Sequence, residues 1–183
     1  LSLEEGTRFH TEYRRGTFEL MDPHVEEIFQ DQADAQLERR GFQRYEISNW
    51  AKSGSVCQHN LRYWQGLEYL GLGPSAQSYL AESRFGNVSN IEQYRTHLEA
   101  GELPVVQKEC LSRLQQEKER IVFGLRLIEG IPIHWMNGLL QDKAWAMSFQ
   151  QMIKEDYLFQ TSSRLQLTRK GRQFADSVGM RLL

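Results

Sequence analysis

Hydrophobic and polar positions alternate along this chain with periods that predict both helices and short strands. Hydrophobic residues recur at helical spacing from Val25 to Leu37, directly after Asp22-Pro23, an N-cap aspartate followed by a first-turn proline. Gly41 is expected to end this helix. Further helices are predicted over residues 90–100, 112–128, 132–141, 142–155 and 169–182.

Other segments have the composition of β structure. Residues 42–50 are rich in strand-forming side chains and closely follow a helix. Residues 69–76 predict a buried strand that runs into a tight glycine turn, and 78–88 predict a hairpin or loop. Two strands over 157–160 and 164–168, with helices on both sides, are typical of a winged-helix-like module.

The pattern changes near Pro104, which divides the chain into two predicted domains. Residues 1–106 mix helices and strands, and their first twenty residues read as loop with short structure. Residues 107–183 are mainly helical and contain the winged-helix-like module. The fold class expected from this order is α/β, followed by a helical accessory domain.

Composition narrows the possible functions. The 183 residues are 40% hydrophobic and 25% charged with a net charge of −2, so no strong field attracts nucleic acid or an anionic membrane. Cys57 and Cys110 are too few for a disulfide scaffold and fit a reducing compartment. No apolar run approaches the roughly 18 residues of a membrane span. The start at Leu1, without a targeting segment, is expected for a piece of a longer protein.

The segment from Cys57 to Trp64 concentrates groups that can hold an iron-bearing ring. His59 offers an imidazole that can bind iron axially, and Tyr63 and Trp64 offer apolar faces beside it. The alternative is structural: His59 and Asn60 cap a helix while the two aromatic residues face the core. Residue types alone leave both interpretations open.

Two further features allow a binding role and a structural role. Gly71-x-Gly73 at a strand end can bring backbone N–H groups close to a ligand, or can simply permit close strand packing. Glu46 on an apolar strand can bind a polar or cationic group, or can form a buried ion pair with Arg44 or Arg62.

Zinc and nucleic acid are weaker possibilities. Cys57-x-His59 has no second ligand pair, so a structural zinc site is not expected. The last helix and wing carry a basic face that includes Arg169 and Arg172, which raises a DNA-binding alternative. Nearby acidic residues balance this face, so a solvated surface is the preferred interpretation and no nucleic-acid partner is expected.

Three motifs in one order carry a family resemblance: Tyr45 to Ala51, His59 to Trp64, and Tyr69 to Ala76. This arrangement resembles the HemW-type haem chaperones of the radical SAM superfamily, which are relatives of oxygen-independent coproporphyrinogen III oxidase. The match extends to Gly6-Thr7, to Gly124-Leu125-Arg126 and to the segment from Leu165 to Gly171. It covers nearly the whole chain, but only the later half of a family member.

The resemblance implies a fold and a set of cofactors. Residues 1–106 would be the C-terminal part of a radical SAM partial (βα) barrel, and 107–183 the family's winged-helix-like C-terminal domain. A full-length relative would bind a [4Fe–4S] cluster through a Cys-x3-Cys-x2-Cys loop, and S-adenosylmethionine. Cys57 and Cys110 lack that spacing, so this chain alone is not expected to hold the cluster or generate a radical, and no catalytic residue is assigned.

The resemblance also implies binding residues. His59 would be the metal ligand of the haem iron, within a motif formed by His59, Asn60, Tyr63 and Trp64. The last barrel strand, near S-adenosylmethionine, would correspond to Gly71, Leu72 and Gly73, and Glu46 would lie on the neighbouring strand at the barrel mouth.

One departure from the family stands on this strand. Relatives usually read Gly-x-Gly-Ala-Gly-Ala-His-Ser, whereas this chain has Pro74, Ser75 and Gln77 at the Ala, Gly and His positions. Proline removes a backbone donor, and glutamine does not replace an imidazole as a metal ligand.

The function implied is haem delivery to an acceptor apoprotein, for which a respiratory enzyme is one candidate. The alternative is an oxygen-independent coproporphyrinogen III oxidase acting by radical decarboxylation, so enzyme status stays open, although the haem motif favours the chaperone. A cytoplasmic location is expected, with membrane association only through a partner, and a dimer is a further alternative. The acceptor, and whether haem is bound covalently, are not determined by the sequence.

Overall fold

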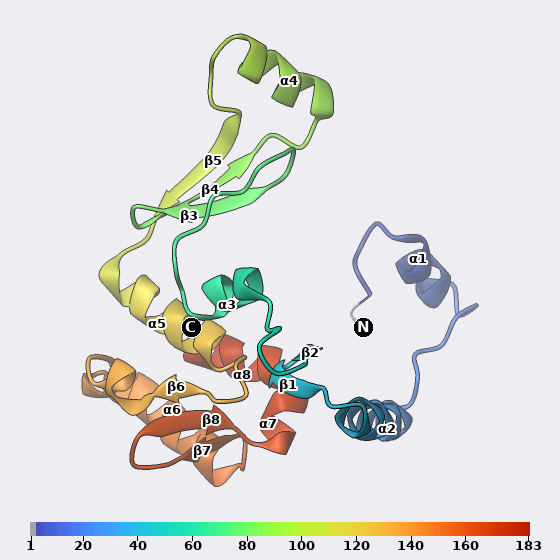
Figure 1. Ribbon diagram of the computed structural model, residues 1–183, viewed down its shortest axis with the longest axis vertical. Coiled ribbons are helices and arrows are strands. Elements are labelled where there is room, and N and C mark those ends of the chain that lie inside the picture. The colour runs from blue at the N-terminus through green and yellow to red at the C-terminus, as the bar shows by residue number, and fades with distance from the viewer. Residues whose placement is uncertain (1–2) are drawn as a thin grey trace. The chain divides into compact units, whose positions relative to one another are not determined.

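The computed structural model describes residues 3–183, which divide into two compact units between Gln43 and Arg44 (Figure 1). The first unit contains α1 (Arg8–Arg14) and α2 (Pro23–Arg39).

Both helices of the first unit have side-chain caps. The Thr7 hydroxyl accepts a hydrogen bond from the His10 N–H, and the Asp22 carboxylate accepts one from the His24 N–H. The predicted start of α2 is therefore confirmed. Gly41 has φ of +79° just after the helix, as predicted for a residue that ends it.

Gln43, the last residue of the first unit, also begins β1 (Gln43–Glu46). At the start of the second unit, β1 pairs with β2 (Asn49–Ala51) in a two-stranded sheet. The β structure predicted for residues 42–50 is confirmed, as two strands rather than one because the chain turns at residues 47–48. This hairpin is tied to the C-terminal half of the unit: the Ile47 N–H donates to the Arg126 carbonyl at 3.0 Å, and Glu46 forms an isolated bridge with Leu127.

The buried strand predicted over residues 69–76 was wrong. Tyr69 forms only an isolated bridge with Tyr79, and Leu70 and Leu72 are 61% and 83% exposed. A Cβ atom at Gly71 would lie 2.2 Å from the Gln77 carbonyl oxygen, so the segment folds closely against the strand that follows it. Local contacts, rather than a neighbouring strand, determine its path.

A three-stranded antiparallel sheet follows, with the order β3 (Gln77–Leu80), β4 (Ser83–Asn87) and β5 (Val105–Cys110). The pairing of β3 with β4 confirms the predicted hairpin. Residue 106 lies within β5, and the predicted division of the chain at this point stays a prediction.

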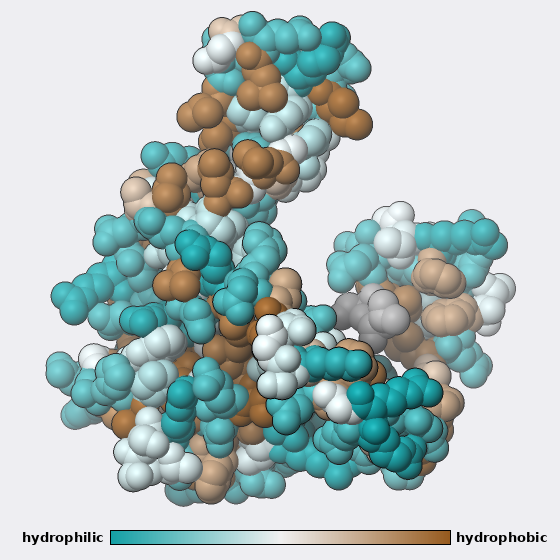
Figure 2. Space-filling model, viewed as in Figure 1, coloured by the Kyte–Doolittle hydropathy of each residue, from teal (hydrophilic) through white to brown (hydrophobic). Residues whose placement is uncertain are grey.

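Between β4 and β5 lies α4 (Ile91–Glu99), capped by Asn90 and followed by Gly101 at φ of +73°, which confirms the helix predicted over residues 90–100. Figure 2 shows hydrophobic side chains on the surface of this part of the unit, and Leu103 and Ile91 are 81% and 69% exposed.

The C-terminal part contains α-helices, short 3-10 helices and a small sheet (Figure 1). Its elements in chain order are α5 (Arg113–Gly124), β6 (Ile131–Pro132), η1 (Ile133–Met136), η2 (Leu139–Gln141), α6 (Lys143–Lys154), β7 (Leu158–Gln160), β8 (Arg164–Leu167), α7 (Arg169–Gln173) and α8 (Ala175–Leu182). The two predicted wing strands are confirmed, and β6 adds a third in the order β6-β8-β7.

Helix lengths here differ from the prediction. A capping box between Ser112 and Gln115 begins α5, but the helix ends at Gly124 rather than 128. The segment 132–141 forms two 3-10 turns instead of one helix, and the last helix is interrupted at Phe174.

One hydrophobic core holds this part together. It is formed by α5, α6, α8 and the small sheet, with Phe149, Met152 and Leu165 at most 1% exposed. All the residues of this buried cluster lie between Ile121 and Leu182. Among residues 3–183, no helix is long and apolar enough to cross a membrane.

Candidate functional site

Four of the predicted site residues lie on α3 (Gln58–Trp64). His59 and Tyr63 are four positions apart and therefore share one helix face. The His59 Nε2 atom lies 2.9 Å from the Tyr63 hydroxyl, and the two rings meet edge to face with centroids 4.8 Å apart. His59 is exposed to solvent. The imidazole is accessible, and one hydroxyl partner orients it.

Asn60 and Trp64 fix α3 against the rest of the unit. The Asn60 amide donates to the Tyr45 hydroxyl at 3.2 Å, which connects the helix to β1. The guanidinium of Arg126 lies 4.8 Å from the centre of the Trp64 ring, a cation–π contact. Cys57, rather than His59 or Asn60, occupies the N-cap position, so the capping alternative for this motif was wrong.

The Tyr63 ring continues into a cluster of aromatic residues. Its centroid lies 4.3 Å from that of Tyr69, at an interplanar angle of 61°. Burial raises the pKa of the Tyr69 hydroxyl, and the neighbouring Tyr63 raises it further. Tyr63 thus joins the exposed imidazole on one side to a partly desolvated interior on the other.

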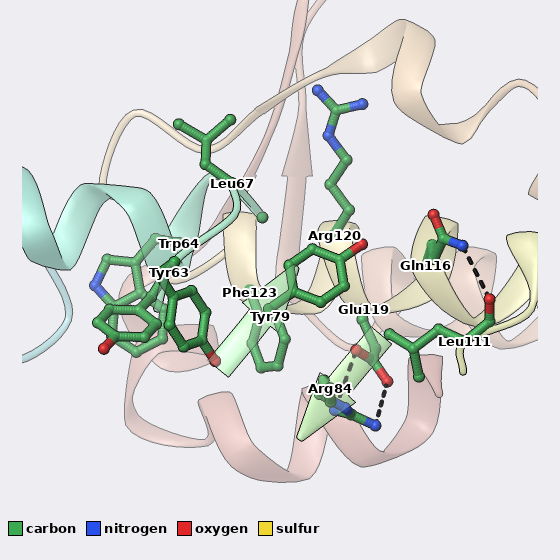
Figure 3. Close-up of a pocket in the computed structure, with 12 residues that line it drawn as sticks. Tyr63, Trp64, Leu67, Tyr79, Arg84, Leu111, Gln116, Glu119, Arg120 and Phe123 are labelled. Atoms are coloured by element: carbon green, nitrogen blue, oxygen red, sulfur yellow. Dashed lines mark hydrogen bonds and ion pairs between the residues drawn. The ribbon is translucent and has the colours of Figure 1, made fainter. Parts of the chain in front are cut away.

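That interior is a cavity of about 350 Å³ between α3, the β3–β4 hairpin and α5 (Figure 3), here called the hairpin cavity. Such a volume falls at the low end of the roughly 300–1,000 Å³ of small-molecule sites. The residues that line it are mainly aromatic or aliphatic with a few charged ones: Tyr63, Trp64, Gly66, Leu67, Tyr69, Tyr79, Arg84, Leu111, Gln116, Glu119, Arg120 and Phe123.

An ion pair crosses one wall of the hairpin cavity (Figure 3). Both terminal nitrogens of Arg84 approach the Glu119 carboxylate, at 3.2 Å and 3.1 Å, and one of them lies 2.8 Å from Glu109. Burial raises the pKa of Glu119, and the nearby Glu109 raises it further, against the attraction of Arg84. The cost of desolvating the carboxylate therefore exceeds its gain from the pair.

A second cavity, of about 400 Å³, lies between α3, α5 and α8 and is here called the helix cavity. Trp64 and Phe123 line both cavities. The Trp64 Nε1 and Arg126 Nε atoms are buried and have no hydrogen-bond partner. Arg126 also contacts Asp176 of α8 at 3.2 Å, so this region links α3 to the last helix.

Glu46 is placed differently from the α3 residues. Its side chain is fully buried, and its Oε1 atom accepts hydrogen bonds from the Ser48 N–H at 2.9 Å and the Asn49 amide at 2.6 Å. Its Oε2 atom has no hydrogen-bond partner. Glu46 holds the β1–β2 turn, and a binding role for it stays a prediction.

The hydrogen-bond partners of Gly71 and Gly73 are not residues of the α3 motif. The Gly71 N–H donates to the Ser78 hydroxyl at 3.0 Å, and the Gly73 N–H donates to the Tyr94 hydroxyl at 3.1 Å. Leu72 is 83% exposed. Because both glycine N–H groups already have partners within the chain, close packing accounts for these glycines, and a ligand role stays a prediction.

The described residues do not offer a cluster site. Within residues 3–183, no group of three or more His, Cys, Asp or Glu side chains could hold a metal ion. Cys57 and Cys110 are free and exposed. The [4Fe–4S] cluster expected of a full-length relative therefore has no ligand set in this part of the chain.

The basic face of the winged-helix-like part is internally paired. Arg181 lies 2.7 Å from Glu155, and Lys170 donates to the Glu155 carbonyl and lies 4.3 Å from the Tyr157 ring centre. Hydrogen bonds from Gln151 and Arg181 lower the pKa of Glu155. These contacts are those of a packing surface.

Sequence reasoning missed Arg84, Tyr79, Glu119 and Phe123 as residues of the hairpin cavity. Glu119 and Phe123 are four positions apart on a helix that was predicted, so their common face was visible in the sequence. Nothing in the sequence connected that face to the β3–β4 hairpin, because the contact joins segments about 35 residues apart.

The fold places this chain in a recognisable class. It resembles coproporphyrinogen III oxidase (HemN) from Escherichia coli, described as a radical SAM enzyme, with a TM-score of 0.68 and 16% sequence identity. The superposition covers 89% of this chain and 42% of that structure. The predicted α/β fold is confirmed. No family model matches the sequence.

Comparison with sequence relatives narrows the assignment further than the fold does. The chain is 34% identical over its full 183 residues to the heme chaperone HemW of Mycobacterium tuberculosis, covering 46% of that protein. It is 28% identical to the heme chaperone HemW of Lactococcus lactis over 97% of the chain and 47% of the relative. A mitochondrial radical S-adenosyl methionine domain-containing protein 1 of Danio rerio is 34% identical over 74% of the chain.

The chain is thus a homologue of the HemW-type heme chaperones, which confirms the predicted resemblance. It spans about half the length of the curated relatives it matches.

Proposed function

We propose that this chain is the haem-binding portion of a HemW-type haem chaperone and that His59 is the ligand of the haem iron. The relatives named heme chaperone HemW support the class. The observation that supports the site is the exposed His59 imidazole, with aromatic residues beside it on α3 and in the adjoining cavity. An imidazole that reaches solvent can accept a bulky planar ligand without unfolding its surroundings.

The contacts of His59 suit reversible binding. A haem iron would accept the lone pair of an imidazole nitrogen. If the Tyr63 hydroxyl donates to Nε2, it occupies the lone pair that iron would use, so binding at Nε2 breaks one hydrogen bond. That competition lowers affinity by an amount typical of a single hydrogen bond. A chaperone must also release its cargo, and a modest opposing contact serves this purpose.

The remaining properties are proposed for the full-length protein. It binds a [4Fe–4S] cluster and S-adenosylmethionine, for which residues outside this chain supply the cluster ligands. It delivers haem to an acceptor apoprotein, with a respiratory enzyme as one candidate, and acts in the cytoplasm or at a membrane through its partner. The fold shared with HemN favours coproporphyrinogen III oxidation as the alternative function. Decarboxylation of coproporphyrinogen III by the full-length protein under anaerobic conditions would support that alternative.

Titration with haem tests the assignment of His59. His59→Ala should weaken haem binding at least about tenfold and remove the shift of the Soret band, because an axial ligand is lost. His97→Ala is the matched control, since His97 is also a helical histidine, lies on α4 and pairs with Glu102. Equal Soret titrations of His59→Ala and the unchanged chain would refute His59 as the ligand.

A further inference from the structure

We propose that the hairpin cavity is a second contact site for the porphyrin, which enters by one edge and places a carboxylate on Arg84. This inference rests on the proposed haem-binding function and deepens it. It assigns the ring and its acidic side chains to a different set of residues from the one that holds the iron.

The shape and lining of the hairpin cavity select a flat, apolar group. Tyr63, Tyr69, Tyr79 and Phe123 supply aromatic surfaces, and Leu67 adds an aliphatic one (Figure 3). Aromatic side chains stack well on other flat rings, in offset or edge-to-face arrangements. A volume of about 350 Å³ suits part of a porphyrin rather than the whole ring.

The guanidinium of Arg84 gives the hairpin cavity a partner for a carboxylate. The lining includes two cations, Arg84 and Arg120, and one anion, Glu119. Glu109 contacts Arg84 from outside the lining, so the charges balance. Arg84 already presents both terminal nitrogens to a carboxylate, that of Glu119. A guanidinium fork matches the two oxygens of any carboxylate. Glu119 therefore marks the position that a carboxylate of the porphyrin would take or share.

The hairpin cavity adjoins His59 through a single side chain. Tyr63 contacts the His59 Nε2 atom with its hydroxyl and also lines the cavity. A ligand that reaches both places needs to pass only this one residue. Iron and ring contacts are consequently separable: the first depends on His59, and the second on Arg84 and the cavity wall.

Iron-free protoporphyrin IX is the probe that separates the two contacts. Titration of the 183-residue chain, followed by porphyrin fluorescence, should show saturable binding. Arg84→Gln should weaken it about tenfold or more, because a charged hydrogen-bonding partner is lost. His59→Ala should change protoporphyrin binding by less than about twofold while weakening haem binding. Arg113→Gln is the matched arginine control, since Arg113 is 91% exposed on α5 and also pairs with a glutamate.

A second variant covers the case in which Arg84→Gln does not fold. Leu67→Glu places a carboxylate on the cavity wall and should weaken protoporphyrin binding, whereas Leu80→Glu should not. The pair is matched because Leu67 and Leu80 are both 43% exposed, and Leu67 alone lines the cavity.

The possible results separate the two proposals. No saturable protoporphyrin binding, or equal binding by the unchanged chain, Arg84→Gln and Leu67→Glu, would overturn the cavity inference even if His59→Ala still weakened haem binding. Conversely, an unchanged haem titration for His59→Ala would overturn the iron ligand and leave the cavity result standing.

Discussion

The winged-helix-like part of the chain and the part that carries the proposed haem site are built on different kinds of contact. The first has a continuous hydrophobic core of thirteen buried residues, all from Ile121 to Leu182. In the second, from Arg44 to Leu111, the buried hydrophobic residues are Ala51, Val88 and Leu111, and three buried residues are polar: Glu46, Ser78 and Ser83.

This difference indicates that one part supplies stability and the other supplies the proposed binding surface. Burial of apolar surface is the main favourable term in folding, so the winged-helix-like part carries most of the stability of the second unit. The haem-site part is held by hydrogen bonds, a cation–π contact and aromatic contacts around α3. Elements with few buried apolar contacts open at low free-energy cost, which suits a surface that accepts and releases a large ligand.

The largest expected effect is on the core. Phe149→Ala should lower the free energy of unfolding by about 3–5 kcal/mol, because Phe149 is 1% exposed and stacks on Trp145 at 5.6 Å between ring centroids. Phe159→Ala is the control in the same part, since Phe159 is 53% exposed, and should cost about 0.5 kcal/mol or less. Urea unfolding followed by circular dichroism measures both.

The contrast between the two parts would be wrong if removing a phenylalanine from the haem-site part lowered the free energy of unfolding as much as Phe149→Ala. Phe85→Ala in β4 should cost clearly less than Phe149→Ala, because Phe85 is only partly buried and lies outside the core. Equal losses for these two variants would show that the β3–β4–β5 sheet contributes a core of its own.

An intermediate effect is expected at Glu46, where the two parts join. Glu46→Ala should cost about 1–3 kcal/mol, because the Ser48 N–H and the Asn49 amide both lose their acceptor. Glu46→Gln keeps an acceptor oxygen and should recover most of this loss. Hydrogen exchange should increase in residues 44–51 and leave α6 unchanged. Equal destabilisation by Ala and Gln would show that the hydrogen bonds are not the cause.

The smallest expected effect concerns the free energy of unfolding, which should depend on pH in opposite directions through Glu119 and Glu155. Burial raises the pKa of Glu119 above its ordinary value of 4.5, so the folded state holds the proton longer than the unfolded chain. The free energy of unfolding should therefore fall, relative to Glu119→Gln, as the pH rises from about 4.5 through the folded pKa. Below the unfolded pKa both states are protonated, and the pH-dependent difference disappears.

Glu155 should behave in the opposite way. Hydrogen bonds from Gln151 and Arg181 lower its pKa below 4.5, so its contribution is present above that value and is lost as the pH falls through the folded pKa. Urea unfolding of Glu119→Gln and Glu155→Gln between about pH 3 and 7 measures both slopes. Slopes of the same sign would contradict the assigned causes.

Local signals in the sequence predicted much of this fold. Asp22 caps a helix as expected, and Asn90 and Thr168 cap helices that were predicted to begin at or next to them. Such starts are predictable because a cap and its N–H partners are only two or three residues apart. The strand expected over 69–76 failed for the opposite reason. Its apolar residues resemble a buried strand, but strand-like pairing is limited to the bridge between Tyr69 and Tyr79. Side chains of Ser78, Asn87 and Tyr94 bind the backbone at Gly71 and Gly73.

The candidate site likewise has one part that the sequence predicted and one part that it did not. The helical face shared by His59 and Tyr63 follows from their spacing and was visible in the sequence. The approach of Arg84 to Glu119 depends on how the β3–β4 hairpin lies against α5, which no local pattern encodes. Sequence therefore indicated the residue proposed to bind iron, and only the three-dimensional structure revealed the cavity beside it.

The indole of Trp64 separates the hairpin cavity from the helix cavity. Together with Phe123 it lines both the hairpin cavity and the helix cavity, and Arg126 stacks on it while reaching α8 through Asp176. A displacement of the Trp64 indole toward one cavity would reduce the volume of that cavity and increase the volume of the other. The contacts of Trp64 and Arg126 therefore connect the hairpin cavity to the last helix of the chain.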